Sequence, residues 1–289
     1  MDFQEYKLAA PLDRYIECVW FLSDLAPRDA PAERVLPDGC PELIVHLGDR
    51  FRRVSPSGAS EIQPACFFIG PMAGALLIRP EGRVRTMGVR FRSGGARPFF
   101  HPGLDELTDA TVPLDALWGP DGRAFEECLR EARDDRARLA LVEGYLSERL
   151  RASRSEDARV EAAVAMIRAH RGDVSIRGLE SETGLSSRQL ERRFRSSVGL
   201  GPKLLARIVR FQNVLLLAGG SEPAEWAGIA VSCGYFDQAH LSRDVREFAG
   251  ISPGSLAAAG TLSGLFTSPE RLNAFFDVGF FQDRRRAAL

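Results

Sequence analysis

Along the first 120 residues, hydrophobic positions come in short runs separated by turns that contain Pro and Gly. Short apolar runs bounded by such turns are typical of β-strands. Several of them in succession predict a barrel or a sandwich. The runs cover residues 42–47, 66–69, 75–78 and 84–91, and two of the turns are Pro37–Gly39 and Pro80–Gly82.

From Gly122 onward the hydrophobic pattern changes to the spacing of a helix. One apolar stripe recurs every three or four residues and is made of Leu139, Val142, Leu146 and Leu150. The stripe is shorter than three heptads of a coiled coil. It is therefore a candidate dimer seam, a candidate surface for packing against the front domain, or both.

Helical periodicity continues to about residue 258, after a linker at residues 151–155. The expected fold is α+β and multidomain. Residues 1–120 form a β-rich, barrel- or sandwich-like sensing domain, residues 121–153 linker and dimerisation helices, residues 154–260 an all-α domain, and residues 261–289 a tail. The tail is rich in Phe, and we expect it to pack on a domain surface.

The all-α part contains an internal repeat. Adding 51 to five positions of the first copy gives the same residue type in the second: Leu190/Leu241, Arg192/Arg243, Arg195/Arg246, Gly199/Gly250 and Pro202/Pro253. Upstream the offset is 50, so the turn of the second copy is one residue longer. A solenoid needs three or more copies, so a duplicated supersecondary unit explains the repeat better.

Each copy has the pattern of a helix, a turn that contains Gly, and a second helix. In the first copy, Ser186 and Gln189 predict a capping box before the second helix. Leu185 and Leu190 predict the hydrophobic staple that accompanies such a cap.

In the second copy, Asp237 is the expected cap, and Phe236 with Leu241 the expected staple. The outer helix faces are polar and contain Ser187, Arg188, Glu191, Arg192 and Arg195 in the first copy and Gln238, Ala239, Ser242, Arg243 and Arg246 in the second. Residues 186–210 carry seven basic residues and one acid. This pattern predicts two helix-turn-helix units.

Such helices suit DNA. The major groove admits one α-helix, Arg bonds guanine bidentately, and Gln suits adenine. Capped helix N-termini also place backbone N–H groups near phosphates. A charged, solvated face on an ordinary helical bundle is the alternative, and two copies with matched caps and Arg positions argue against it.

Residues 154–258 resemble the DNA-binding domain of AraC/XylS-type transcriptional regulators. The matching stretches are residues 185–194 with 199–202 and residues 229–243 with 250–253. Gly201 stands where that family usually has Ser, and Val245 where it usually has Phe. The resemblance implies two units joined by a long helix, here Lys203–Ala218, with recognition helices in successive major grooves.

The resemblance also implies base contacts from Arg188, Glu191 and Arg192 in the first unit and from Gln238, Ala239 and Arg243 in the second. Candidate phosphate contacts are Ser187, Arg195, Lys203, Ser242 and Arg246. On the joining helix, Lys203, Arg207 and Arg210 form one basic stripe. Arg207 and Arg210 are alternatively partners of acids between the two units.

The front half resembles, less specifically, the barrel-like N-terminal domain of one AraC subgroup, on residues 12–20, 36–44 and 87–91. That resemblance implies a sensing domain, for a small-molecule or protein effector that the sequence does not identify. Trp20, Phe68 and Phe91 are candidates for an apolar pocket or for plain core. Pro37–Gly39 is most simply a turn.

Composition is that of a globular protein, with 45% hydrophobic residues and a net charge of −1. The five cysteines are scattered, which is typical of reduced, buried thiols. His46 and His101 lack the spacing of metal ligands. We see no catalytic motif, and expect no enzyme, metal or cofactor. Repair of alkylated DNA, known for some AraC-like proteins, needs paired cysteines, which Cys18 and Cys40 do not form.

The sequence therefore predicts a one-component, sequence-specific transcriptional regulator, cytoplasmic in a bacterium and nucleoid-associated when bound to DNA. No signal peptide or membrane span is evident. Expected partners are double-stranded DNA with half-sites about one helical turn apart, an effector, RNA polymerase and a second copy of the chain. The competing hypothesis is an interaction module whose helical half does not read DNA.

Overall fold

The computed structural model of the chain describes residues 2–27, 30–55, 57–101, 103–153, 157–218 and 225–258. The predicted tail and residues 154–155 of the predicted linker lie outside the described residues. Among the residues that are described, no helix is both long enough and apolar enough to cross a membrane.

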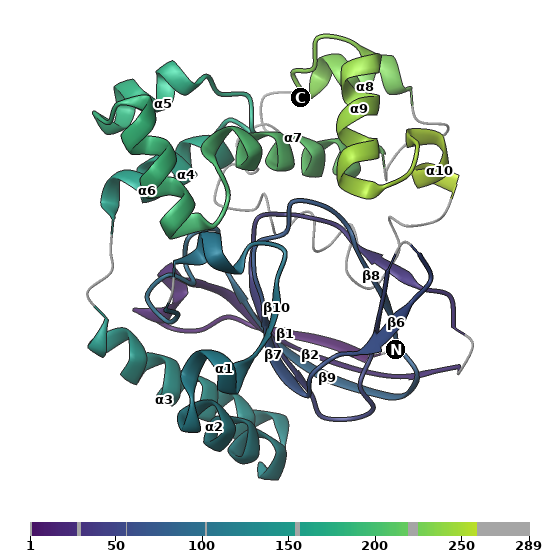
Figure 1. Ribbon diagram of the computed structural model, residues 1–289, viewed down its shortest axis with the longest axis vertical. Helices are drawn as coiled ribbons and strands as arrows, with labels where there is room; N and C mark the ends of the chain where they lie inside the picture. Colours follow the sequence, from purple (N-terminus) through teal and green to yellow (C-terminus); the bar gives the residue numbers. More distant parts are fainter. Residues whose placement is uncertain are drawn as a thin grey trace, which may run out of the picture.

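The front half folds into two antiparallel sheets that share a core (Figure 1). The six-stranded sheet has the order β1 (Asp2–Tyr6), β2 (Ile16–Ala26), β9 (Gly82–Phe91), β4 (Glu42–His46), β7 (Cys66–Ile69) and β10 (Thr111–Pro113). The four-stranded sheet has the order β3 (Glu33–Val35), β8 (Leu76–Arg79), β5 (Arg52–Val54) and β6 (Ser60–Ile62). The predicted β-rich class is confirmed, and the four apolar runs form β4, β7, β8 and β9.

Successive side chains of a strand point to opposite faces of a sheet. In the six-stranded sheet, both of these faces pack against a core. In β2, Trp20 packs into the core shared with the four-stranded sheet, whereas Val19 lies in a second core on the other face. Phe68 and Phe91 belong to that second core. Of the two alternatives for Trp20, Phe68 and Phe91, plain core is therefore the one that the structure shows.

Helices cover this second core. They are α1 (Leu114–Trp118), α2 (Pro120–Glu131) and α3 (Asp135–Ala152), with the 3-10 helices η1 (Leu12–Arg14) and η2 (Leu104–Leu107). The Asp134 carboxylate accepts a hydrogen bond from the backbone N–H of Ala137 at 2.7 Å and so caps α3. Val142 and Leu146 of the predicted stripe are fully buried in the same core. Packing against the front domain is thus what the structure shows for this stripe.

The helical half consists of α4 (Ala158–Ala169), α5 (Ile176–Thr183), α6 (Ser187–Val198), α7 (Pro202–Ala218), α8 (Trp226–Ser232), α9 (Gln238–Ala249) and α10 (Pro253–Ala258). The two sheets of the front half are together called the barrel below. Helix α7 runs across this barrel, with α4–α6 on one side and α8–α10 on the other (Figure 1). Phe194, Phe211 and Phe248 are fully buried in the core that joins these helices. The predicted long joining helix is confirmed as α7.

The barrel docks directly on the helical half. Leu36 and Cys40 of the barrel lie in the helical core. Gly39 has φ +77, and a Cβ there would lie 2.4 Å from Leu205 Cδ1, so both backbone conformation and close approach require Gly. The Pro37–Gly39 segment is therefore a turn that also packs against α7.

Candidate nucleic-acid interface

Two helix-turn-helix units are present, α5–α6 and α8–α9. The first turn passes through Gly184, which has φ +64, and the second through Gly234, which has φ +72. This left-handed backbone is where Gly is favoured, because a side chain strains it. Both second helices end at a left-handed Gly as well, Gly199 and Gly250. The duplication read from the sequence is thus repeated in the backbone.

The cap of α6 is as predicted. Gln189 Oε1 accepts a hydrogen bond from the backbone N–H of Ser186 at 3.1 Å, and the two residues form a capping box. Leu185 and Leu190 are both buried in the helical core, as a staple requires.

The cap of α9 is also as predicted, but its staple is not. Asp237 Oδ1 accepts a hydrogen bond from the backbone N–H of His240 at 2.6 Å. Phe236, however, is 92% exposed, so it does not pack on Leu241. Tyr235 is buried instead, and its ring lies edge-on to His240 at 5.1 Å. The reason is the longer second turn, which moves the inward-pointing position back by one residue.

The structure brings the six predicted base-reading residues onto α6 and α9. Arg188, Arg192, Gln238, Ala239 and Arg243 are exposed. Glu191 is half-buried, and its Oε1 binds Arg195 Nε at 2.6 Å. Of the two carboxylate oxygens of Glu191, Oε1 is thus shared with Arg195.

The predicted phosphate contacts lie beside these faces. Ser187, Arg195 and Arg246 are exposed, and Ser242 is half-buried, on the two recognition helices. Lys203 is exposed at the start of α7. Arg195 is already paired with Glu191, and the role of all five side chains in DNA binding stays a prediction.

Arg207 and Arg210 are engaged within the protein. Arg207 Nη2 donates to Asp244 at 2.7 Å and to Glu247 at 2.6 Å, joining α7 to α9. The hydrogen bond from Arg207 holds the pKa of Glu247 below its usual value. Arg210 donates to the carbonyl of Gly172 at 3.0 Å. The predicted pairing with acids is observed for Arg207, whereas Arg210 donates to backbone carbonyls instead.

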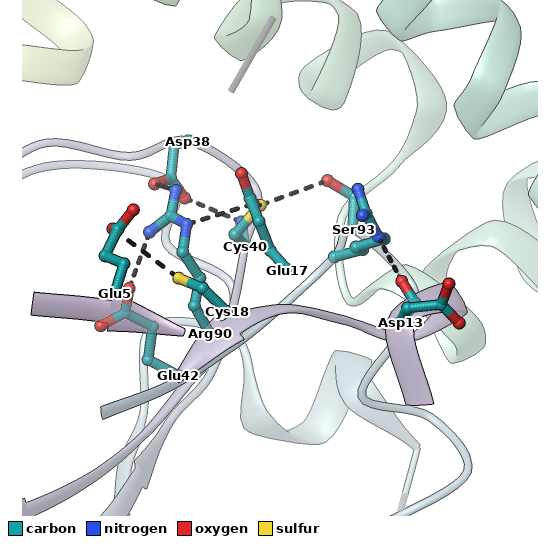
Figure 2. A network of polar contacts seen from close by, with 10 residues as sticks. Glu5, Asp13, Glu17, Cys18, Asp38, Cys40, Glu42, Arg90 and Ser93 are labelled. Carbon is teal, nitrogen blue, oxygen red and sulfur yellow. Dashed lines mark hydrogen bonds and ion pairs between the residues drawn. The ribbon is translucent and has the colours of Figure 1, made fainter. Parts of the chain in front are cut away.

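An ionic cluster that the sequence reasoning missed lies where the barrel meets α7. Arg90 on β9 donates to Glu42 at 2.7 Å, to Glu17 at 3.3 Å and to Asp38 (Figure 2). Asp38 also accepts from the backbone N–H of Cys40 at 2.8 Å, which shapes the docking turn. The segments on which the front half resembles its AraC subgroup contain Asp38, Glu42 and Arg90. Their presence in those segments was the one indication in the sequence that these residues matter.

The cluster stays charged in spite of its burial. Burial alone would lower the pKa of Arg90, but the surrounding carboxylates raise it well above its ordinary value. Burial likewise opposes ionisation of Glu17, yet the positive charges of Arg90 and its neighbours hold its pKa below the usual value. A buried guanidinium shared by three carboxylates ties β2, β4 and β9 to the docking turn.

Two buried thiols and a buried imidazole of the front half are poorly suited to reaction. Burial raises the pKa of the Cys18 and Cys40 thiols to about 12, so neither forms a thiolate readily. Burial lowers the pKa of His46 to about 4. Within the described residues, no group of three or more His, Cys, Asp or Glu side chains is arranged to hold a metal ion.

Two family models match the chain. A model described as a helix-turn-helix domain matches residues 179–259. A model described as a domain of unknown function (DUF6597) matches residues 4–113. Comparison with curated protein sequences gives no match.

Solved structures also match. ToxT from Vibrio cholerae is 12% identical over 84% of this chain and 99% of its own, with a TM-score of 0.47. ToxT with a bound unsaturated fatty acid is 13% identical over 82% of this chain and 94% of its own, with a TM-score of 0.43. A probable AraC family transcriptional regulator from Rhodopseudomonas palustris is 30% identical over 36% of this chain and 97% of its own, with a TM-score of 0.33. The helix-turn-helix match over residues 179–259 makes the chain a DNA-binding transcriptional regulator whose C-terminal domain is of AraC type.

Proposed function

We propose that this regulator binds a bipartite DNA site, with α6 reading one half-site and α9 the other from the same face of the duplex. The observation that carries the proposal is the pair of matched, exposed, Arg-bearing helices held by one joining helix. Arg192 on α6 and Arg243 on α9 occupy equivalent positions of the repeat and are both exposed. An Arg side chain can bond guanine, and the Gln238 amide can bond adenine.

The length of α7 supports the spacing of the half-sites. Its 17 residues make a helix about 26 Å long at a rise of 1.5 Å per residue. One turn of duplex is about 34 Å, and a helix-turn-helix unit packed on each side of α7 extends the span. Because Arg207 links α7 to α9, we expect the two units to move as one rigid body rather than independently. We therefore expect half-sites about 10–10.5 bp apart.

In this proposal the barrel controls the DNA-binding half. It contacts the C-terminal ends of α6 and α9 and the side of α7. Thr108 Oγ1 donates to the carbonyl of Gly199 after α6 at 2.7 Å, and Arg34 Nε to the carbonyl of Ala249 at the end of α9 at 3.2 Å. Gln212 Nε2 of α7 donates to the carbonyl of Pro37 at 2.6 Å. An effector that shifts the barrel therefore shifts both recognition helices.

The effector is expected to bind the barrel, because strands of the barrel are linked to these contacts. Arg90 of β9 pairs both with Glu42 of β4 and with Asp38, which lies in the turn that packs on α7. The proposal includes action in the bacterial cytoplasm, at the nucleoid when bound, with RNA polymerase and a second copy of the chain as further partners. It assigns the protein no catalytic step.

The test is selection of bound duplexes from a random pool by the full-length protein. We expect a bipartite motif whose halves lie about one turn apart. Arg192→Ala and Arg243→Ala should each weaken binding to the selected duplex by about 1–3 kcal/mol and relax base preference at one position, in different halves of the motif.

The matched control is Arg133→Ala, which removes one positive charge from an exposed side chain between α2 and α3 of the front half. It should leave both affinity and motif unchanged. Equal losses on selected and random duplexes for Arg192→Ala and Arg243→Ala would show that these side chains touch phosphate alone. No enriched motif, either for the full chain or for residues 154–289, would refute the proposal.

A further inference from the structure

One large apolar side chain stands in solvent next to the second recognition helix. Phe236 is 92% exposed and directly precedes Asp237, the cap of α9. A single exposed apolar side chain is ordinary on a protein surface. What distinguishes Phe236 is its position, two residues before Gln238 at the end of α9 that enters the groove.

Comparison of the two helix-turn-helix units shows that this exposure is specific to the second. Leu185 precedes the cap of α6, as Phe236 precedes the cap of α9, and it is 3% exposed in the helical core. In the second unit Tyr235 fills that core instead. The additional residue of the second turn thus releases an aromatic side chain from the core and places it beside the reading surface.

The first residues of α9 do not cover the ring of Phe236. Gln238 and Ala239, which begin the helix, are themselves exposed. Tyr235 points inward, where its ring packs against His240 and lies 5.3 Å from the Arg210 guanidinium. The surface at this end of α9 therefore combines an amide, a methyl group and an aromatic ring.

We propose that Phe236 is a specificity-determining residue that makes an apolar contact with the 5-methyl group of a thymine, in the half-site read by α9. This inference rests on the proposed function, since it requires α9 to lie in the major groove. The thymine methyl is the apolar group that base edges present there, and Phe is among the side chains that contact it. Burial of the ring against that methyl group removes apolar surface of both partners from water.

The experiment compares the wild-type protein with Phe236→Ala on the duplex that the wild type selects. Because the ring is exposed, the substitution should leave the thermal unfolding midpoint unchanged. Binding should weaken about threefold to tenfold, the loss expected for one or two buried methylene-sized groups. Selection with the variant should lose the preference for thymine at one position of the α9 half-site and keep the rest of the motif.

Replacing that thymine by deoxyuridine, which lacks the 5-methyl group, tests the contact itself. The replacement should weaken the wild-type protein and leave Phe236→Ala unaffected, while Phe236→Leu should keep part of the thymine preference. Leu25→Ala is the matched control, because Leu25 is 76% exposed on β2 of the barrel. It should bind and select like the wild type.

Three results would overturn the inference. An unchanged motif and affinity for Phe236→Ala would show that the ring is idle. A loss of equal size on selected and random duplexes would place the ring against the DNA backbone. Deoxyuridine weakening both proteins equally would assign the methyl group to another residue. Failure of the wild type to select any motif is distinguishable, because it removes the proposed function as well.

Discussion

At the scale of single residues, position decides what a charged side chain does. Arg207 and Lys203 lie on one stripe of α7, yet Lys203 is exposed whereas Arg207 pairs with Asp244 and Glu247. By residue type alone, both are basic residues of a DNA-binding domain. Their partners distinguish them, and those of Arg207 lie on α9, 37 and 40 residues further along the chain.

His46 carries the clearest pH dependence. It is fully buried against the rings of Phe51 and Phe67, and burial lowers its pKa from an ordinary value of 6.5 to about 4. The unfolded chain therefore binds a proton more readily than the folded one, and stability falls as pH drops from about 6.5 toward 4. We expect the free energy of unfolding to fall by about 2 kcal/mol from this group between pH 7 and pH 5.

Urea unfolding at the two pH values measures this change. In His46→Gln the residue that titrates is gone, so the difference between the two pH values should shrink by about that amount. An identical pH difference in the wild type and the variant would assign the dependence to other groups.

The sequence predicted the residues whose partners are local. Asp237 and the Ser186–Gln189 pair were predicted as caps because a cap acts within three residues, and the structure confirms both. Phe236 was predicted wrongly, because one added residue in a turn changes which side chain points inward. Trp20 and Phe68 were linked by residue type, although strand alternation sends them to opposite faces.

At the scale of elements, the contact between α7 and α9 holds the second unit in place. Asp244 is 2% exposed and its carboxylate faces Arg207, whose guanidinium also lies over the ring of Phe248 at 5.0 Å. Removing one partner of a buried pair leaves an uncompensated charge, which costs about 3–5 kcal/mol. Arg207 is partly exposed, so water reduces that cost.

We therefore expect Arg207→Ala to lower the free energy of unfolding by about 2–4 kcal/mol. The double variant Arg207→Met with Asp244→Asn should lose less than the two single variants together. Lys203→Ala, an exposed cation on the same helix, should change it by less than about 0.5 kcal/mol. If Arg207→Ala weakened DNA binding without any loss of stability, Arg207 would be a phosphate contact after all.

The strand and helix runs were predictable where one periodicity held over a whole element. The apolar faces of both recognition helices follow from that rule, whereas the joining helix was implied by the family resemblance. The choice between dimer seam and barrel packing for Val142 and Leu146 could not be made, because an apolar stripe does not say which apolar surface it meets. The structure places it on the barrel.

At the scale of the whole molecule, the barrel and the DNA-binding half behave as coupled parts. The Gln212 amide is buried and donates to the carbonyl of Pro37, so its loss leaves a buried acceptor without a partner, at a cost of about 1–3 kcal/mol. The long-range ionic cluster around Arg90 shapes the same turn. Residues this far apart in sequence give no periodic signal, which is why sequence reasoning read Pro37–Gly39 as a turn alone.

Gln212→Ala should loosen the docking of the two halves. In calorimetry the variant should separate the unfolding of the barrel from that of the helical half more than the wild type does. Arg188→Ala, an exposed change in the same half, should leave the profile as it is. A Gln212→Ala profile that matches the wild type would show that this hydrogen bond does not couple the halves.

The central claim is that both units read one duplex at once, from one face. Its most direct test is the affinity of the wild-type protein for the selected duplex before and after insertion of about five base pairs, half a helical turn, between the half-sites. Because α7 and its contacts hold the units rigidly, we predict that the insertion reduces affinity to that of a duplex with a single half-site. Undiminished affinity for the lengthened duplex would contradict the account.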